Sequence, residues 1–245
     1  ILIEVCVDSV ESALAAVRGG ADRLELCANL GLGGGTTPSI GLLKAVQSAV
    51  PETPIMAMIR PRTGDFLYSA SELEVMSEDI QIFKALGVTG VVFGVLTCGG
   101  RIDVEHTELL VQEALPMDGA HTCHLVPYQL YKPLSSGYRK SAVDSARDGV
   151  LVKIVDCAKR VAEKKKRQRP ISLLFGSGIN PVTVDRILHF LRDGLREIHL
   201  TGGRWIEGGM WHRPEGMDMG APGKEWNVWR TSEEAIREVR VRADE

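Results

Sequence analysis

Short β-like runs alternate with longer helical segments along most of this chain, and this rhythm constrains the fold more than any other feature. The first run, Ile1–Val7, precedes a helical segment that begins at Ser9, a suitable N-cap, and stops at Gly19-Gly20. Further runs predict strands at Arg23–Cys27, Pro54–Ile59, Gly90–Gly94, Ile171–Phe175 and Leu195–Thr201. Intervening segments predict helices at Ser69–Leu86, Glu105–Ala114, Arg147–Glu163 and Pro181–Arg192. Such alternation implies parallel strands with helical crossovers.

The length of the chain selects among folds built from these units. Its 245 residues lie within the usual size of one α/β barrel. We therefore predict a single domain over residues 1–245 with a TIM-type (β/α)8 barrel, and a doubly wound sheet is the structural alternative. The strand–helix rhythm breaks from Met117 to Ala146, so we expect the barrel to be irregular or incomplete around residues 118–146.

Charge and cysteine content narrow the partners and the compartment. The net charge of −3 gives no electrostatic case for nucleic acid or anionic membranes as partners. No apolar stretch approaches the roughly 20 residues that span a bilayer. The five cysteines are scattered, which favours a reducing compartment, and we predict a cytoplasmic location. The run Lys164–Arg167 is typical of a solvated helix end, with nuclear import or nucleic-acid contact as the weaker alternative.

Polar side chains share one face of the predicted strands. Because alternate residues of a strand point to opposite sides, the aliphatic faces should pack on the helices and the others should line the barrel lumen. Closure of the barrel would bring the lumen residues of the first, second and last strands together. These residues are Glu4, Cys6, Glu25, Cys27 and His199, with Arg60 nearby. They form either a functional site at the strand ends or a buried ion-pair network, with Glu4 or Glu25 against Arg23 or Arg60, that only fills the lumen.

Two of these residues are candidate metal ligands. Cys6 and Cys27 each follow a glutamate by two residues and end neighbouring strands. Adjacent strands lie ~4.8 Å apart, so two thiolates there can share a soft ion. Sulfur ligands select Cu(I), and His199, Met56 or Met58 can supplement them. The alternative is that both cysteines are small buried hydrophobes.

A second set of residues suits an anion. Arg60 and Arg62 follow the third strand, and guanidinium groups bind carboxylate or phosphate bidentately. Glycines follow the last two strands, where many barrels hold a phosphate with backbone N–H groups. They are Gly176, Gly178, Gly202 and Gly203. Such glycines also arise simply because strand-to-helix turns are tight.

Several motifs together resemble the CutC copper-homeostasis family. The resemblance is dense from Ile1 to about Met117 and resumes from about Ser145 to Gly220. The motifs are Glu4–Ser9, Gly19–Cys27, Gly34–Ser39, Ile59–Arg62, Gly64–Ser69, Gly90–Gly94 and Glu197–His199. The resemblance implies a TIM-type barrel, a cytoplasmic setting, a role in copper homeostasis and Cu(I) binding with Cys6 and Cys27 as ligands. It also makes a homo-oligomer plausible.

The chain departs from this family between Asp118 and Asp144. The family carries a Phe-His-Arg-Ala-Phe-Asp run on its fifth strand and a Leu-Thr-Ser-Gly run at the end of its sixth, and neither is present here. His121, Cys123 and His124 stand near the start of this region, where they are weak candidates for metal ligands. The departure weakens the case for an enzyme.

Two functions follow from these observations. The first is copper handling through Cu(I) bound at Cys6 and Cys27, which the paired cysteines favour. The second is an enzyme acting on a small phosphorylated or carboxylated metabolite. In that enzyme Arg60 and Arg62 hold the anion and Glu4 or Glu25 serves as general acid or base, which the lumen carboxylates favour. A barrel that binds a partner and has lost its chemistry is a third, weaker interpretation.

Overall fold

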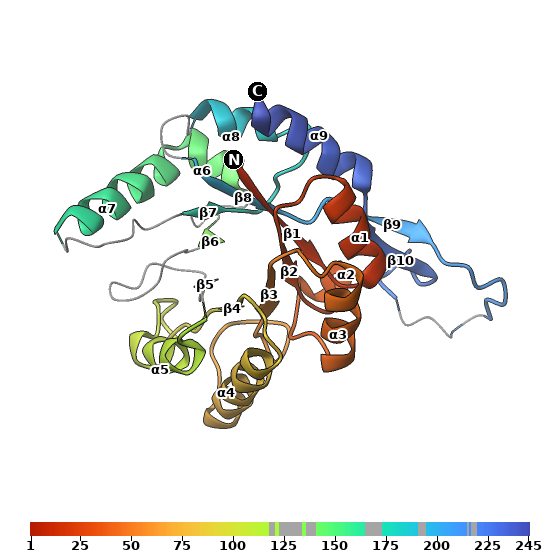
Figure 1. The fold of residues 1–245 in the computed structure, drawn as a ribbon, viewed down its shortest axis with the longest axis horizontal. Coiled ribbons are helices and arrows are strands. Elements are labelled where there is room, and N and C mark those ends of the chain that lie inside the picture. The colour runs from red at the N-terminus through yellow and green to blue at the C-terminus, as the bar shows by residue number, and fades with distance from the viewer. Residues whose placement is uncertain are drawn as a thin grey trace.

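Eight parallel strands form one curved sheet in the computed structural model, which describes residues 1–117, 121–122, 134–135, 141–164, 173–190, 195–214, 216 and 220–245 (Figure 1). The strand order is β5-β4-β3-β2-β1-β8-β7-β6. The strands are β1 (Leu2–Val7), β2 (Arg23–Leu26), β3 (Ile55–Met58), β4 (Gly90–Phe93), β5 (His121–Thr122), β6 (Leu134–Ser135), β7 (Leu174–Phe175) and β8 (Glu197–Leu200). This sequential order around a central pair is that of a TIM barrel.

Helices follow most of the strands and cover the outside of the sheet (Figure 1). They are α1 (Val10–Arg18), α2 (Leu30–Gly33), α3 (Ile40–Ala49), α4 (Ala70–Ala85), α5 (Val104–Ala114), α6 (Ala142–Arg147), α7 (Val150–Lys164), α8 (Val184–Phe190) and α9 (Glu233–Asp244). Polar N-caps set several of their starts. Ser69, for example, accepts a hydrogen bond from the N–H of Glu72, and the Glu72 carboxylate accepts one from the Ser69 N–H.

The predicted barrel is confirmed, including its irregular section. Strands β5 and β6 have two residues each, and they pair with β4 and β7 respectively. In the described part of the chain β5 and β6 do not pair with each other, so the sheet stays open between them. Both strands lie within residues 118–146, where the sequence lacks a regular strand–helix unit.

One hydrophobic layer joins the sheet to the helices. Ile3, Val5 and Val7 on β1 are fully buried, as are Leu24 and Leu26 on β2. Burial of each such side chain contributes about 1.5–3 kcal/mol, so this layer holds the strands in register. The other face of the same strands is left to line the lumen.

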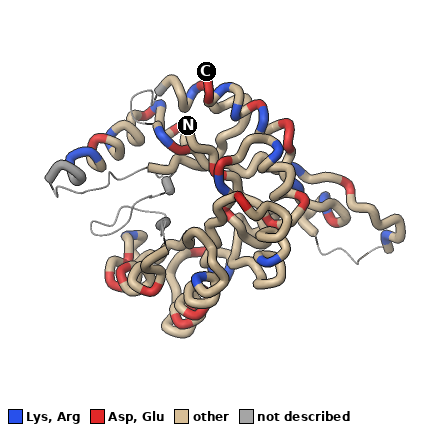
Figure 2. Tube along the Cα trace, in the orientation of Figure 1, with Lys and Arg blue, Asp and Glu red and all other residues tan. Residues whose placement is uncertain are grey.

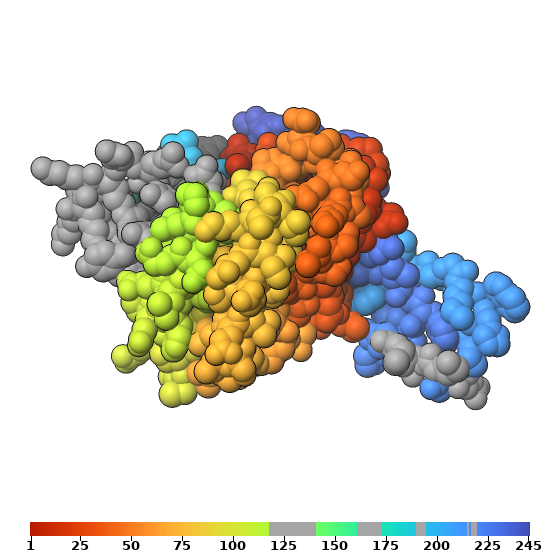
Figure 3. Space-filling model, turned by 60° about the horizontal axis from the view of Figure 1, so that its bottom comes forward, coloured from red at the N-terminus to blue at the C-terminus, as the bar shows by residue number. Residues whose placement is uncertain are grey.

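A two-stranded hairpin, which the sequence does not predict, follows β8. Its strands β9 (Gly203–Glu207) and β10 (Asn227–Thr231) are antiparallel, and Trp205 stacks edge to face on Trp229 with ring centroids 5.4 Å apart. The hairpin projects from the barrel beside α1, and the space-filling view shows it standing clear of α3, α4 and α5 (Figure 3). It begins at the mouth of the barrel, so its base becomes part of the rim.

Charges of both signs are interspersed along the outer helices (Figure 2). Ion pairs between neighbouring helices are part of this pattern; Arg18 of α1, for example, bonds Glu233 of α9 at 2.7 Å. Exposed pairs of this kind contribute about 0–1 kcal/mol each. None of the described helices is both long and apolar enough to cross a membrane.

Candidate functional site

The register of three neighbouring strands places polar side chains side by side in the lumen. Strand β1 lies between β2 and β8. Glu4 pairs with His199 on β8, and Cys6 pairs with Glu25 on β2. Since these residues occupy the face opposite the aliphatic layer, their side chains meet inside the barrel.

A continuous line of polar contacts runs through this group. Arg23 donates a hydrogen bond to Glu4 Oε2 and another, of 3.0 Å, to Glu197 Oε2. The second carboxylate oxygen of Glu4 lies 2.8 Å from His199 Nδ1. The opposite ring nitrogen, His199 Nε2, lies 2.8 Å from Cys6 Sγ. Glu4 therefore orients the imidazole so that its Nε2 faces the thiol.

Cys6, Glu25 and His199 form a compact cluster of metal-ligating groups. One ligand atom from each lies within 4.8 Å of the others, and all three residues are buried. The Cys6 thiol donates to Glu25 Oε2 over 3.0 Å. The other carboxylate oxygen, Glu25 Oε1, is buried without a hydrogen-bond partner. A buried carboxylate oxygen without a partner is costly, so this atom marks a place for a cation or a donor group.

Burial and neighbouring charges shift the ionisation of this cluster. Burial, then the Glu25 carboxylate, raises the pKa of the Cys6 thiol well above its ordinary value. Burial also raises the pKa of Glu25, although His199 opposes the shift. Burial alone would lower the pKa of His199, but the carboxylates of Glu25 and Glu4 outweigh it and raise that pKa. Additional negative charge is therefore disfavoured here, whereas a cation is favoured.

Cys27 is placed differently from the sequence-based prediction. It follows Glu25 by two residues, directly after β2, so it lies beyond the level at which Cys6 and Glu25 pair. Its thiol contacts the Val7 carbonyl oxygen at 3.6 Å, and burial raises its pKa. Of the two predicted thiolate ligands, the structure brings Cys6 but not Cys27 into the cluster with His199.

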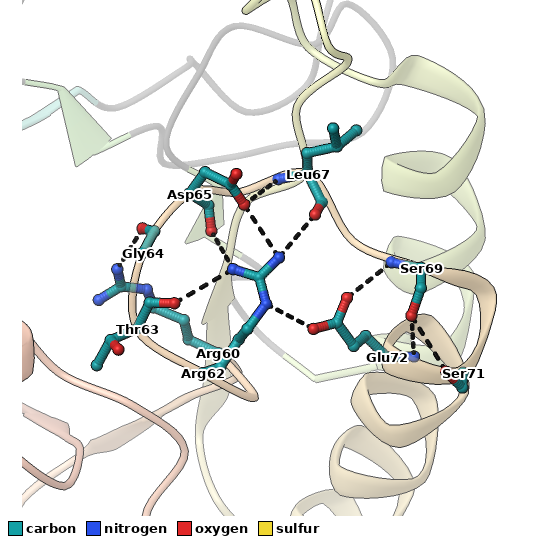
Figure 4. A network of polar contacts seen from close by, with 9 residues as sticks. All are labelled: Arg60, Arg62, Thr63, Gly64, Asp65, Leu67, Ser69, Ser71 and Glu72. Atoms are coloured by element: carbon teal, nitrogen blue, oxygen red, sulfur yellow. Dashed lines mark hydrogen bonds and ion pairs between the residues drawn. The ribbon is translucent and has the colours of Figure 1, made fainter.

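Arg60 and Arg62 also have partners that the sequence does not reveal (Figure 4). Arg62 bonds Glu72 at 2.5 Å and Asp65 at 3.0 Å, so its charge is already paired. Its guanidinium also donates to the carbonyl oxygens of Thr63 and Leu67. These contacts hold the loop on α4, and the anion contact of Arg62 stays a prediction.

Among the described residues, the hydrogen-bond acceptors of Arg60 are backbone carbonyl oxygens. Its acceptors are Gly33 and Gly35 at 2.8 Å and Gly64 at 3.0 Å, and its guanidinium lies over the Phe66 ring. These contacts fix the Arg60 side chain at the wall of a cavity at the carboxyl ends of the strands. Arg60 therefore does not contact Glu4 or Glu25. The ion pairs of the lumen, which the alternative of a buried ion-pair network expects, are made by Arg23 with Glu4 and Glu197.

A cavity of about 800 Å³ opens above the cluster at the carboxyl ends of the strands. Cys6, Glu25 and His199 lie at its floor. The cavity is also lined by three of the glycines that the sequence places after the last two strands, Gly178, Gly202 and Gly203. Gly176 is buried directly after β7 and is not among the lining residues. Arg204, which the sequence reasoning missed, also lines the cavity from the base of the hairpin.

Comparisons with known proteins now place the chain. The model of the CutC family matches residues 1–204. The human copper homeostasis protein cutC homolog is 40% identical over 227 residues, which are 90% of this chain and 80% of that protein. The chain belongs to the CutC family. A CutC family protein of Vibrio vulnificus strain CMCP6 is 36% identical over 82% of this chain and 80% of its own length.

The fold agrees with that of a CutC family structure. The crystal structure of the Streptococcus agalactiae copper homeostasis protein CutC superposes with a TM-score of 0.65 and 26% sequence identity. The match covers 82% of this chain and 98% of the other. The resemblance inferred from the motifs is thus confirmed for both family and barrel.

Part of the region in which the chain departs from the CutC family lies outside the described residues. Cys123 and His124 are not described, and for His121 only the backbone is, in β5. Their proposed ligand role therefore stays a prediction. The cluster of Cys6, Glu25 and His199 draws on β1, β2 and β8 alone, so it does not depend on that region.

The raised pKa of the Cys6 thiol in this CutC family chain predicts slow alkylation. At pH 8, iodoacetamide should label Cys6 and Cys27 at least ~10-fold more slowly than the exposed Cys98, because each pKa unit lowers the thiolate fraction about tenfold. Peptide mass spectrometry over time measures the rates, and urea-unfolded protein serves as the control. Labelling of Cys6 as fast as that of Cys98 would contradict the buried, protonated thiol.

Proposed function

We propose that the chain handles copper by binding Cu(I) at Cys6 and His199, with Glu25 beside them. The observation that carries this proposal is the 2.8 Å contact between Cys6 Sγ and His199 Nε2 at the floor of an open cavity. Thiolate sulfur and imidazole nitrogen are ligands that copper accepts. An ion that joins them replaces the hydrogen they share, and the two atoms must move apart to admit it.

The surroundings of His199 support this role. Metal-binding histidines usually donate their second ring N–H to a carboxylate, which fixes the tautomer and the ring orientation. Glu4 Oε1 occupies this position at 2.8 Å from Nδ1, and Arg23 in turn bonds Glu4. With the proton on Nδ1, the lone pair of Nε2 points at the cluster.

The charge of the lumen also supports a cation. Among the described residues, Glu4, Glu25 and Glu197 are buried in the lumen together with the permanent cation Arg23. His199 adds a positive charge only when it is protonated. A monovalent ion near Glu25 offsets the remaining negative charge and gives the unpartnered Oε1 a counter-charge. The four described cysteines Cys6, Cys27, Cys98 and Cys157 are free thiols, which suits the inferred reducing, cytoplasmic setting.

X-ray absorption at the copper edge tests this ligand set. The Cu(I)-loaded protein should show one sulfur ligand together with nitrogen or oxygen ligands. The Cys6→Ser variant should lose the sulfur signal, whereas Cys27→Ser, the matched control, should leave the spectrum unchanged. Two sulfur ligands in the parent protein, with one lost in either variant, would instead favour the shared Cys6–Cys27 site.

A second candidate function is an enzyme acting on a small anionic metabolite. The size of the cavity favours it, because about 800 Å³ lies in the range of small-molecule sites and far exceeds the need of one ion. Glu25 lines the cavity, and burial raises its pKa, which is the direction that suits a general acid. Under this function Glu25→Gln should abolish turnover, and Cys6→Ser with Cys27→Ser should leave the metabolite site largely intact.

A further inference from the structure

The cavity above the cluster has opposite charges at its two ends. At the floor, Glu25 is 1% exposed, and its Oε1 has no hydrogen-bond partner. At the rim, Arg204 is exposed and belongs to the first residues of β9. Arg60 lines the wall between them. This polarity is unlike that of a site shaped for a metal ion alone, which needs no positive rim.

The charges of Arg204 at the rim and Arg60 on the wall are not paired with carboxylates of the described residues. In the described part of the chain neither Arg60 nor Arg204 forms an ion pair with a carboxylate, and the hydrogen bonds of Arg60 go to backbone carbonyl oxygens. Ser177 and Gly178, both in the left-handed region of φ, and Gly202 line the same end of the cavity. An anionic group at this end would meet an available guanidinium and the backbone of two strand-end turns.

Apart from Arg60, the wall between the two ends is largely apolar. Leu30, Phe66, Phe93, Ile179 and Leu200 line it. A ligand that spans the cavity therefore needs a hydrocarbon or aromatic middle, since a polar middle would lose its water there without finding partners. The volume of about 800 Å³ admits a molecule of this kind.

We propose that the cavity binds a small bipolar molecule, with a carboxylate or phosphate at Arg204, an apolar middle, and an ammonium or hydroxyl donor at Glu25. The inference rests on the second candidate function in that it names the class of molecule for the same cavity. It concerns binding only, so it can be tested without turnover and without copper.

Three matched probes test the proposal by calorimetry on the full chain. The first, 4-(aminomethyl)benzoate, carries an ammonium and a carboxylate on one ring; benzylamine lacks the carboxylate, and 4-methylbenzoate lacks the ammonium. The first probe should bind at least ~10-fold more tightly than either of the others, because each charged contact contributes about one factor of ten.

Two variants locate the ends of the ligand. Arg204→Glu should weaken 4-(aminomethyl)benzoate at least ~10-fold and leave benzylamine unchanged, whereas Glu25→Gln should weaken benzylamine. Arg186→Glu, an exposed arginine on α8 outside the cavity, is the charge-matched control and should change nothing. Circular dichroism confirms that each variant is folded.

Equal affinities for the three probes, or no loss in Arg204→Glu, would overturn the inference. Tight binding of the bipolar probe, lost in Arg204→Glu while Cu(I) affinity is unchanged, would support it and separate the rim from the copper site. If the bipolar probe binds as expected and no chemical change follows with any such molecule, the enzyme function fails and the binding inference stands.

Discussion

Replacing Arg23 with methionine is expected to lower the free energy of unfolding by about 3–5 kcal/mol, because it leaves two buried carboxylates without their shared counter-charge. Arg23 is 5% exposed and bonds both Glu4 and Glu197 in the lumen. Methionine fills a similar volume, so the loss reports charge rather than packing. Urea unfolding followed by circular dichroism measures the change.

A variant that removes the whole charge group is the control. Arg23→Met combined with Glu4→Gln and Glu197→Gln should regain most of the lost stability, since no uncompensated charge remains. In Arg23→Met alone, the folded-state pKa of the carboxylates should rise above the unfolded value. The destabilisation is then largest above that raised pKa and shrinks as the pH falls through it. A loss under about 1 kcal/mol at pH 7 would contradict the account of the lumen.

The apparent affinity for Cu(I) should rise about tenfold for each pH unit between roughly pH 6 and 8, provided that Cys6 is the thiolate ligand. Burial and Glu25 raise the pKa of the Cys6 thiol, so the thiol is protonated across this range and must release its proton to bind the ion. The pKa of His199 is raised as well, and Nε2 binds only in the neutral ring. The slope should therefore steepen towards the acid end of the range.

Competition with a chelator of known pH dependence, repeated at several pH values, measures this slope. Cys6→Ser should flatten the slope, because the remaining ligands include no thiol that must ionise. Cys27→Ser is the control and should keep it. An affinity that is independent of pH in the parent protein would mean that no protonated thiol takes part.

Strand alternation predicted much of the lumen correctly. It assigned Glu4, Cys6, Glu25 and His199 to one face, and the barrel order brings the strands that carry them together. These inferences succeed because the period of two and the sequential order of parallel strands follow from backbone geometry. They need no knowledge of individual side-chain conformations.

Register and loop contacts explain what the sequence could not predict. Cys6 and Cys27 both lie at the carboxyl ends of neighbouring strands. Because Cys6 is paired with Glu25 in the register of the sheet, Cys27 lies two residues farther along than the partner of Cys6. The ion pair of Arg62 with Glu72 could not be predicted, because the spacing of the residues does not show how the loop returns to α4. Arg204 could not be predicted as a lining residue, because Gly202-Gly203 resembles the end of a strand–helix unit. In the structure the chain instead enters a hairpin there.

The central claim is that Cys6 and His199, rather than the pair Cys6 and Cys27, hold Cu(I). The most direct test is an anaerobic titration of the reduced, metal-free protein with Cu(I) against a competing chelator, repeated for Cys6→Ser, Cys27→Ser and His199→Ala. We expect tight binding in the parent, at least ~100-fold weaker binding in Cys6→Ser and His199→Ala, and little change in Cys27→Ser. An equal loss in both cysteine variants with His199→Ala unchanged would contradict the claim, as would the absence of competitive binding in the parent.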